Sequence, residues 1–171
     1  PAYISMFPSI YARLVALGLH DRADWRIHEV RLYGEVFDDS LLEIGSKCAS
    51  TKITETYSTE EFGRIACQCV SGRGLHVNEE LLFVEILDAD GMPCKTGDVG
   101  RVVVTDFRNL CCPMVRYDTG DYAEYGGREC RCGRKSMLLT KIMGRKRNLL
   151  VTADGKARWP RLGQLFREFD G

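Results

Sequence analysis

The chain lacks an excess of charge of either sign. Its 171 residues include 24 lysines and arginines and 24 aspartates and glutamates, so the formal net charge is zero. A protein without a net charge exerts no long-range attraction on nucleic acids or on anionic membranes. The composition therefore argues against a nucleic-acid-binding protein, and we expect no nucleic-acid partner.

Long hydrophobic runs are also missing. Hydrophobic residues make up 44% of the chain, but no stretch approaches the roughly 20 apolar residues that span a bilayer. The first residues, PAYISMFPSIYARL, show no charged-then-apolar leader of the kind that directs secretion. We expect a cytoplasmic protein without a membrane partner, and the start at proline rather than methionine predicts a fragment of a longer protein.

Cysteine, in contrast, is abundant. Eight cysteines are spread unevenly along the chain, whereas disulfide frameworks are typical of short secreted chains. In a cytoplasmic protein we expect reduced thiols, some of which bind a metal.

The first part of the chain predicts a βαβ unit. Residues 9–18 have the apolar spacing of a short helix, with Ser9 as its N-cap and Gly18 as its stop. Residues 29–33 and 52–57 alternate as strands, and a second helix is expected at 40–46 between them. A strand, a helix and a strand joined by short connections imply a parallel sheet.

The second part predicts an antiparallel sheet or a small barrel. Short strands are separated by turns rich in glycine and aspartate, such as the turn at 88–91. The predicted strands are residues 81–87, 100–105 and 114–117. The predicted domains are an α/β portion at 1–65, a β-rich subdomain with a zinc site at 66–143, and a hinge with the start of a truncated C-terminal domain at 144–171.

Three polar motifs are candidates for ligand binding, and each has a plainer alternative. Thr59 and Glu60 follow a predicted strand, where a hydroxyl and a carboxylate suit a phosphate and Mg²⁺; the alternative is the cap and first turn of a helix. Asp121 follows a glycine turn and suits the two hydroxyls of a ribose; the alternative is a surface turn. The basic run at 144–148 suits a phosphate; the alternative is a solvated segment.

Cysteine and histidine occur in two clusters that suit zinc. Structural zinc is bound by four cysteine or histidine ligands in a tetrahedron. We predict Cys69, His76, Cys130 and Cys132 as the ligands, with Cys67 as a spare thiol. The alternative is a set of buried free thiols, which is common for cysteine.

The order of these motifs resembles the later motifs of adenylate-forming enzymes, which include the acyl-CoA synthetases. The matching pieces are Thr59-Glu60, the stretch Tyr117 to Asp121, and Gly144-Arg145. The stretch GLHVNEEL from Gly74 resembles the phenylacetate-CoA ligase branch and its capsule-biosynthesis relatives, as does Cys-Gly-Arg at 132–134. The resemblance implies that the chain is an internal fragment of a larger adenylate-forming N-terminal domain.

The resemblance also implies roles for individual residues. Thr59 is expected to contact the α-phosphate of ATP, Glu60 to bind Mg²⁺, Asp121 to bind the ribose, and Arg145 to contact the nucleotide between phosphate and ribose. Tyr57 is expected at the adenine, although it stands one place later than the tyrosine in the family pattern Tyr-Gly-x-Thr-Glu.

The same resemblance places Gly34 and Glu35 against the adenine. Some members of the branch carry a zinc site of cysteine and histidine, in agreement with the four ligands predicted above. The phosphate loop, most of the acyl pocket and the adenylation lysine of the family are absent from this sequence.

The expected function is therefore part of an ATP-dependent ligase. Such an enzyme converts a small carboxylic acid and ATP into an acyl-adenylate and pyrophosphate, and then passes the acyl group to a thiol such as coenzyme A. The fragment alone is expected to be inactive. The alternative from another class is a zinc-stabilised binding module without catalytic activity.

Overall fold

The structure is a computed structural model that describes residues 2–19, 27–36, 51–72, 74–151 and 157–159. The described chain forms two compact units, and the change from the first to the second falls between Thr56 and Tyr57. The helix predicted at 40–46 lies outside the described residues. Among the described helices, none has the length and apolar character needed to cross a membrane.

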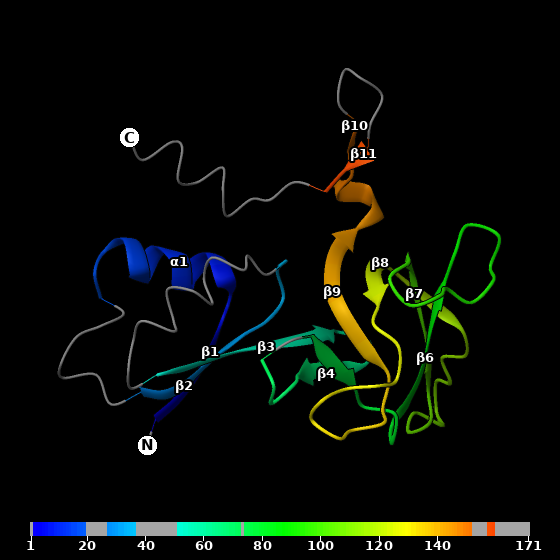
Figure 1. The fold of residues 1–171 in the computed structure, drawn as a ribbon, viewed down its shortest axis with the longest axis horizontal. Coiled ribbons are helices and arrows are strands. Elements are labelled where there is room, and N and C mark those ends of the chain that lie inside the picture. The colour runs from blue at the N-terminus through cyan, green and yellow to red at the C-terminus, as the bar shows by residue number, and fades with distance from the viewer. Residues whose placement is uncertain (1, 20–26, 37–50, 73, 152–156, 160–171) are drawn as a thin grey trace. The chain divides into compact units, whose positions relative to one another are not determined.

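The first unit contains a parallel sheet with one helix. Its elements in chain order are β1 (Ala2–Met6), α1 (Pro8–Ala16), β2 (Ile27–Leu32) and the first half of β3 (Lys52–Thr59) (Figure 1). β2 pairs in parallel with both β1 and β3. The predicted parallel α/β portion is thus confirmed, with β1 as a further strand that the sequence pattern did not indicate.

Helix α1 begins one residue earlier than predicted. Phe7 is its N-cap and Pro8 takes the first helical position, where a missing backbone N–H costs nothing. The predicted cap at Ser9 is wrong, because the Ser9 hydroxyl instead donates a hydrogen bond to Glu35. The helix ends before Gly18, which has the left-handed backbone that glycine adopts at low cost. The small core of this unit comprises Tyr11, Ile27, Val30, Leu32 and Ile53.

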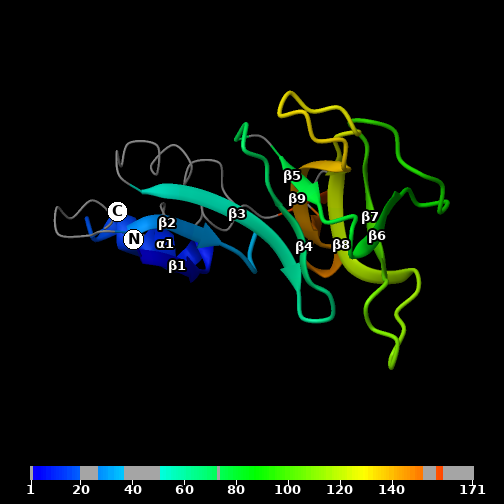
Figure 2. The same ribbon diagram turned by 90° about the horizontal axis from the view of Figure 1, so that it is seen from below.

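The second unit contains antiparallel strands. Its strands are the end of β3, β4 (Gly63–Gln68), β5 (Leu75–Val77), β6 (Leu82–Leu87), β7 (Val99–Asp106), β8 (Tyr117–Tyr125) and β9 (Leu138–Arg145). They lie in the order β3-β4-β5-β9-β8-β7-β6 (Figures 1 and 2). A 3₁₀ turn (Lys146–Asn148) and a small antiparallel pair, β10 (Leu150–Val151) with β11 (Ala157–Arg158), follow β9. The predicted antiparallel sheet is confirmed.

Two local predictions are wrong in this unit. The strand predicted at 114–117 begins only at Tyr117, because Arg116 has a left-handed backbone, with φ of 49°, that a strand does not accept. The alternative interpretation of the segment with Thr59 and Glu60, as the cap and first turn of a helix, is also wrong: β3 continues to Thr59, and the chain turns at 60–62 into β4. Gly63, with φ of 65°, closes that turn.

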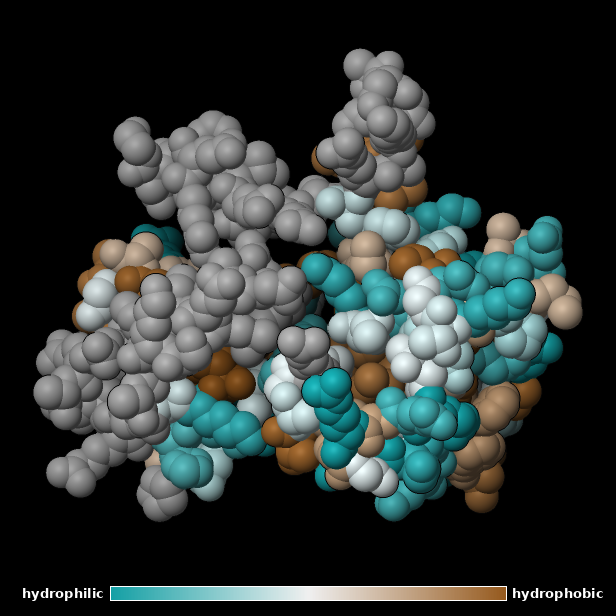
Figure 3. All heavy atoms as spheres, in the orientation of Figure 1, coloured by the Kyte–Doolittle hydropathy of each residue, from teal (hydrophilic) through white to brown (hydrophobic). Residues whose placement is uncertain are grey.

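The core of the second unit comes from alternate residues of its strands. β6 and β7 pair residue by residue from Leu82 opposite Asp106 to Leu87 opposite Arg101, and their apolar side chains pack with those of β4, β5 and β9. The largest fully buried side chains of this core are Phe62, Ile65, Leu75, Leu82, Leu139, Val102 and Val104. The face of this unit seen in Figure 3 mixes hydrophilic and hydrophobic residues, as the balanced composition predicts.

The core position of Leu139 leads to a first prediction. Leu139→Ala removes a completely buried side chain from β9 and should lower the free energy of unfolding by about 2–5 kcal/mol. Leu110→Ala is the matched control, because Leu110 is 84% exposed, and it should change stability by less than about 0.5 kcal/mol. Urea unfolding followed by circular dichroism measures both, and equal effects would contradict this core assignment.

Candidate functional site

Three residues predicted for nucleotide binding meet in one cluster of the second unit. The hydroxyl of Tyr57, on β3, donates a hydrogen bond of 2.8 Å to Oδ2 of Asp121, on β8. Arg145 stands opposite Asp121 in the β8–β9 pair, and its Nε lies 3.4 Å from Oδ1. Tyr57 and Asp121 are buried, whereas the Arg145 side chain is 44% exposed. The carboxylate is therefore held from two sides, with one partner open to solvent.

The Asp-Thr-Gly-Asp segment of β8 orients this carboxylate. Thr119 donates its hydroxyl to the carbonyl of Val102 and accepts the backbone N–H of Asp121. The Asp118 carboxylate accepts the backbone N–H of Gly120, whose φ of 74° is left-handed. The register between β7 and β8 shifts at this point, as at a β-bulge, which re-aims a side chain. The turn residues thus serve to direct Asp121 inward.

The environment of Tyr57 keeps its hydroxyl protonated. Burial raises the pKa of the Tyr57 phenol far above its ordinary value, and the negative charge of Asp121 raises it further. The raised pKa favours the neutral phenol, which donates the hydrogen bond to Asp121.

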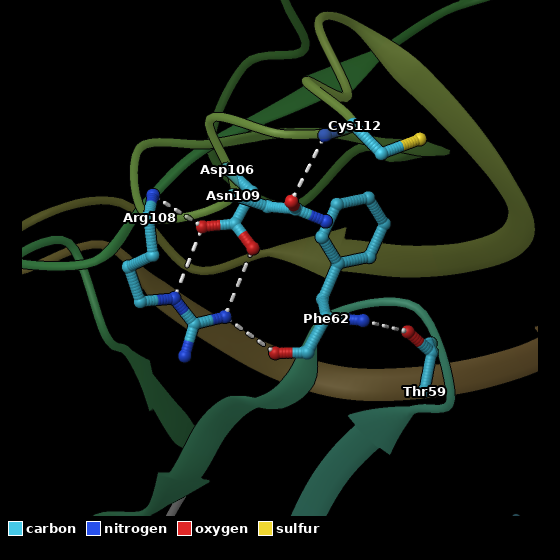
Figure 4. A network of polar contacts seen from close by, with 6 residues as sticks. All are labelled: Thr59, Phe62, Asp106, Arg108, Asn109 and Cys112. Carbon is cyan, nitrogen blue, oxygen red and sulfur yellow. Dashed lines mark hydrogen bonds and ion pairs between the residues drawn. The ribbon is translucent and has the colours of Figure 1, made fainter.

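Thr59 and Glu60 lie where β3 turns into β4. The Thr59 hydroxyl oxygen accepts the backbone N–H of Phe62 at 3.3 Å (Figure 4). Glu60 and Glu61 form the exposed tip of the turn. Phe62 anchors the turn, because its side chain is only 1% exposed and its ring meets Tyr117 edge to face.

An ion pair between a buried carboxylate and a half-exposed guanidinium lies directly behind this turn. Arg108 donates from Nε to Oδ1 of Asp106 at 3.0 Å and from Nη2 to Oδ2 at 3.1 Å, and Nη2 also donates to the carbonyl oxygen of Phe62 at 2.9 Å (Figure 4). The hydrogen bonds from Arg108 hold the pKa of Asp106 below its ordinary value. Sequence reasoning missed this pair, although an Asp-x-Arg spacing directly after a predicted strand is a visible signal.

Gly34 and Glu35 belong to the first unit, whereas the cluster around Asp121 belongs to the second. The Glu35 carboxylate accepts the backbone N–H of Ser9 at 2.8 Å and its hydroxyl at 2.9 Å. A Cβ atom on Gly34 would lie 2.7 Å from the ring of Phe7. Both residues have structural tasks, and their role at an adenine stays a prediction.

The four predicted zinc ligands come together. The donor atoms of Cys69, His76, Cys130 and Cys132 all lie within 4.8 Å of one another. The sulfur atoms of Cys69 and Cys130 are 3.5 Å apart, and Cys132 Sγ is 3.2 Å from His76 Nε2. A tetrahedral zinc with Zn–S bonds of about 2.3 Å sets its sulfur ligands roughly 3.8 Å apart, so these separations fit one zinc ion.

The surroundings of the cluster also suit a metal. His76 Nδ1 lies 3.3 Å from the carbonyl oxygen of Ser136 and 3.1 Å from its hydroxyl, which leaves Nε2 for the metal, as is usual for a histidine ligand. The backbone N–H of Cys132, together with His76, lowers the pKa of the Cys130 thiol to about 6. Cys67 stands opposite His76 in the β4–β5 pair but is not one of the four.

Comparison with known proteins agrees with these motifs. The chain is 28% identical over 159 residues to phenylacetate-coenzyme A ligase from Thermus thermophilus, a match that covers 88% of this chain and 36% of that protein. The chain therefore spans about a third of the length of this curated relative. No protein-family model matches the chain.

Solved structures of CoA ligases share the fold. One is 2-hydroxyisobutyryl-CoA ligase in complex with 2-HIB-AMP, with a TM-score of 0.83, 21% identity, and coverage of 96% of this chain and 38% of that one. Another is o-succinylbenzoate CoA synthetase from Bacillus subtilis in complex with ATP and a magnesium ion, with a TM-score of 0.63, 18% identity, and coverage of 93% and 34%. The predicted resemblance to adenylate-forming enzymes is confirmed, and the chain has the fold of part of such an enzyme.

The lowered pKa of Asp106 leads to a prediction about acid stability. A carboxyl whose pKa is lower in the folded than in the unfolded state stabilises the fold above its unfolded pKa, and this contribution is lost as the pH falls through the folded pKa. The free energy of unfolding should therefore fall between about pH 5 and pH 2 in the wild type, and fall less steeply in Asp106→Asn.

Urea unfolding at a series of pH values measures this slope. Asp90→Asn, which changes an exposed carboxylate in the β6–β7 turn, is the control and should follow the wild type. An Asp106→Asn slope equal to that of the wild type would show that the ion pair with Arg108 adds nothing to acid stability.

Proposed function

We propose that this chain is a segment of an ATP-dependent ligase that activates a small carboxylic acid as its acyl-adenylate and transfers it to coenzyme A. The observation that carries the proposal is the meeting of Tyr57, Asp121 and Arg145 from three strands. The relatives support the same reaction class, since they are CoA ligases whose structures include acyl-adenylates, ATP with magnesium, and CoA. Phenylacetate itself is proposed only from the name of the curated relative.

Asp121 is the proposed ribose ligand. A carboxylate accepts several hydrogen bonds, so it can bind both ribose hydroxyls while Tyr57 donates to Oδ2. Arg145 lies beside the other carboxylate oxygen, with its Nε 3.4 Å from Oδ1. Because the Arg145 side chain is half-exposed, other N–H groups of its guanidinium remain available for a nucleotide phosphate or ribose oxygen.

Thr59 and Glu60 are the proposed phosphate and Mg²⁺ ligands. The Thr59 oxygen accepts the N–H of Phe62, so its O–H is left to donate to an oxygen of the α-phosphate. Glu60 offers an exposed single carboxylate, which suits an ion that keeps several of its water ligands. When bound, Mg²⁺ supplies charge stabilisation at the phosphates.

Acyl transfer requires more groups than the chain supplies. The Thr59, Asp121 and Arg145 side chains bind and orient the nucleotide, and the chain corresponds to about a third of the relative's length. We propose that the 171 residues by themselves bind nucleotide without completing the reaction. Zinc bound by Cys69, His76, Cys130 and Cys132 would have no open position for a substrate, so its proposed role is structural.

Removal of the Asp121 carboxylate tests the nucleotide site. Asp121→Ala should weaken AMP binding by about ten- to a hundredfold, since hydrogen bonds to a charged group contribute about 1.5–3 kcal/mol. Isothermal titration calorimetry with AMP measures the affinity, and Asp90→Ala, which removes an exposed carboxylate, is the control that should bind like the wild type.

Tyr57→Phe separates binding from folding. It keeps the buried ring and removes only the hydrogen bond to Asp121, so a smaller loss of AMP affinity is expected with the fold intact. If the wild type binds no AMP while retaining zinc, the chain is instead a zinc-stabilised binding module.

Substitution of one ligand tests the metal centre. The wild type should contain about one zinc ion per chain, and Cys130→Ser should lose most of it and melt at a lower temperature, because metal binding stabilises the fold. Elemental analysis after dialysis measures the zinc content. Cys67→Ser is the matched control, since Cys67 lies next to the cluster without belonging to it; zinc retained by Cys130→Ser, or lost by Cys67→Ser, would refute this ligand set.

A further inference from the structure

We propose that Asp106 and Arg108 are positioning residues that hold the turn bearing Thr59 and Glu60 in the geometry needed to bind Mg²⁺ and a nucleotide phosphate. This inference rests on the proposed function, because it assigns the support of the same site. Thr59 ends β3 and Glu60 follows it in the β3–β4 turn, whereas Asp106 ends β7 and Arg108 lies in the loop after it. Figure 4 shows Thr59 with Asp106 and Arg108.

The pair has the geometry of a rigid clamp. The Arg108 guanidinium binds both oxygens of the Asp106 carboxylate in a parallel fork, and the backbone N–H of Arg108 donates to Oδ1 at 2.8 Å. Bidentate arginine–carboxylate pairs are directional as well as strong. The loop also holds itself in place, because Asn109 Oδ1 accepts the backbone N–H of Cys112 at 3.1 Å (Figure 4). The Asp106 carboxylate thus fixes the orientation in which the guanidinium contacts the neighbouring turn.

The clamp reaches that turn at a single carbonyl group. Arg108 Nη2 donates to the carbonyl oxygen of Phe62, 46 residues earlier in the sequence. The N–H of Phe62 in turn donates to Thr59 Oγ1, and its ring packs on Tyr117. Phe62 is therefore held at its carbonyl, its amide and its ring. A shift of its carbonyl would move the Thr59 hydroxyl.

Two features indicate that the clamp acts on the turn. The turn carries two adjacent exposed carboxylates, Glu60 and Glu61, and like charges disfavour a tight turn unless it is held in place or binds a cation. The Arg108 side chain is 44% exposed and the Asp106 side chain 4% exposed, so the arginine that pairs with the buried carboxylate is also the group that contacts the turn. The clamp therefore sets the position of the turn.

The test compares ATP binding with and without Mg²⁺. Wild-type chain should bind ATP more tightly when Mg²⁺ is present. Arg108→Met keeps the aliphatic stem and removes the fork, and should reduce that Mg²⁺-dependent gain by about tenfold, while AMP affinity without Mg²⁺ stays within about twofold of wild type, because Tyr57 and Asp121 are untouched. Arg108→Lys, which keeps the charge without the fork, should lose most of the gain as well.

Arg128→Met is the matched control. Arg128 forms a bidentate pair with Glu79 in the same unit, with N–O distances of 3.1 and 2.6 Å, and its substitution should leave both affinities unchanged. A double Asp106→Asn/Arg108→Met variant should lose no more than either single variant, because the two residues act together. Isothermal titration calorimetry provides every affinity.

The outcomes separate this proposal from the proposed function. A wild type that binds AMP but gains nothing from Mg²⁺ overturns the positioning role and leaves the nucleotide site standing. Wild-type Mg²⁺ gain in Arg108→Met overturns it too, as does an equal fall in both affinities, which would mark a role in overall folding. A wild type that binds neither AMP nor ATP refutes the proposed function itself.

Discussion

A buried carboxylate is costly unless its oxygens are hydrogen-bonded or paired with a positive charge, and the arrangement of the second unit satisfies Asp121 on both counts. Tyr57 contributes the hydrogen bond from β3 and Arg145 the positive charge from β9. β3 is far from the consecutive strands β8 and β9 in the sequence, so distant segments are committed to one position in space. Without these partners the buried carboxylate would lack both its hydrogen bond and its ion pair, and the position of its oxygens would no longer be fixed.

β9 links this carboxylate to the cysteine cluster. One end of the strand pairs Leu138 with His76 on β5, and the other end pairs Arg145 with Asp121 on β8. The β8–β9 pairing contains two register shifts between these ends, so hydrogen bonding along the ladder alone does not fix how the far end lies. A metal bound at His76 would hold one end of β9 and thereby help to set the register at the other. In that case the motif with Asp121 and the motif with Cys130 and Cys132 would be adjacent in the sequence because the metal site holds the strand that carries Arg145.

The sequence predicted well what depends on local pattern or on close spacing. The parallel strands around Val30, the turn at 88–91 and the four zinc-ligand candidates all follow from alternation, turn chemistry or clustered cysteines. From the residues alone, Asp121 could also belong to a plain surface turn, and only the family resemblance favoured a ribose ligand. The contact between Arg108 and the Phe62 carbonyl could not be predicted, because it joins residues that are 46 positions apart in the sequence. The late start of β8 depends on one left-handed residue, Arg116, in a stretch whose apolar pattern indicates a strand.

The residues predicted to contact the nucleotide do not all belong to the same unit of the chain. Tyr57, Asp121 and Arg145 belong to one unit with its own core, so their mutual geometry does not depend on the rest of the chain. Glu35 belongs to the other unit, where both of its carboxylate oxygens already accept hydrogen bonds from Ser9. If Glu35 contacts an adenine as predicted, its backbone groups would make the contact, because a side chain that gave up Ser9 would release the start of α1. A backbone contact needs no particular side chain, so residue types alone carry little information about an adenine ligand.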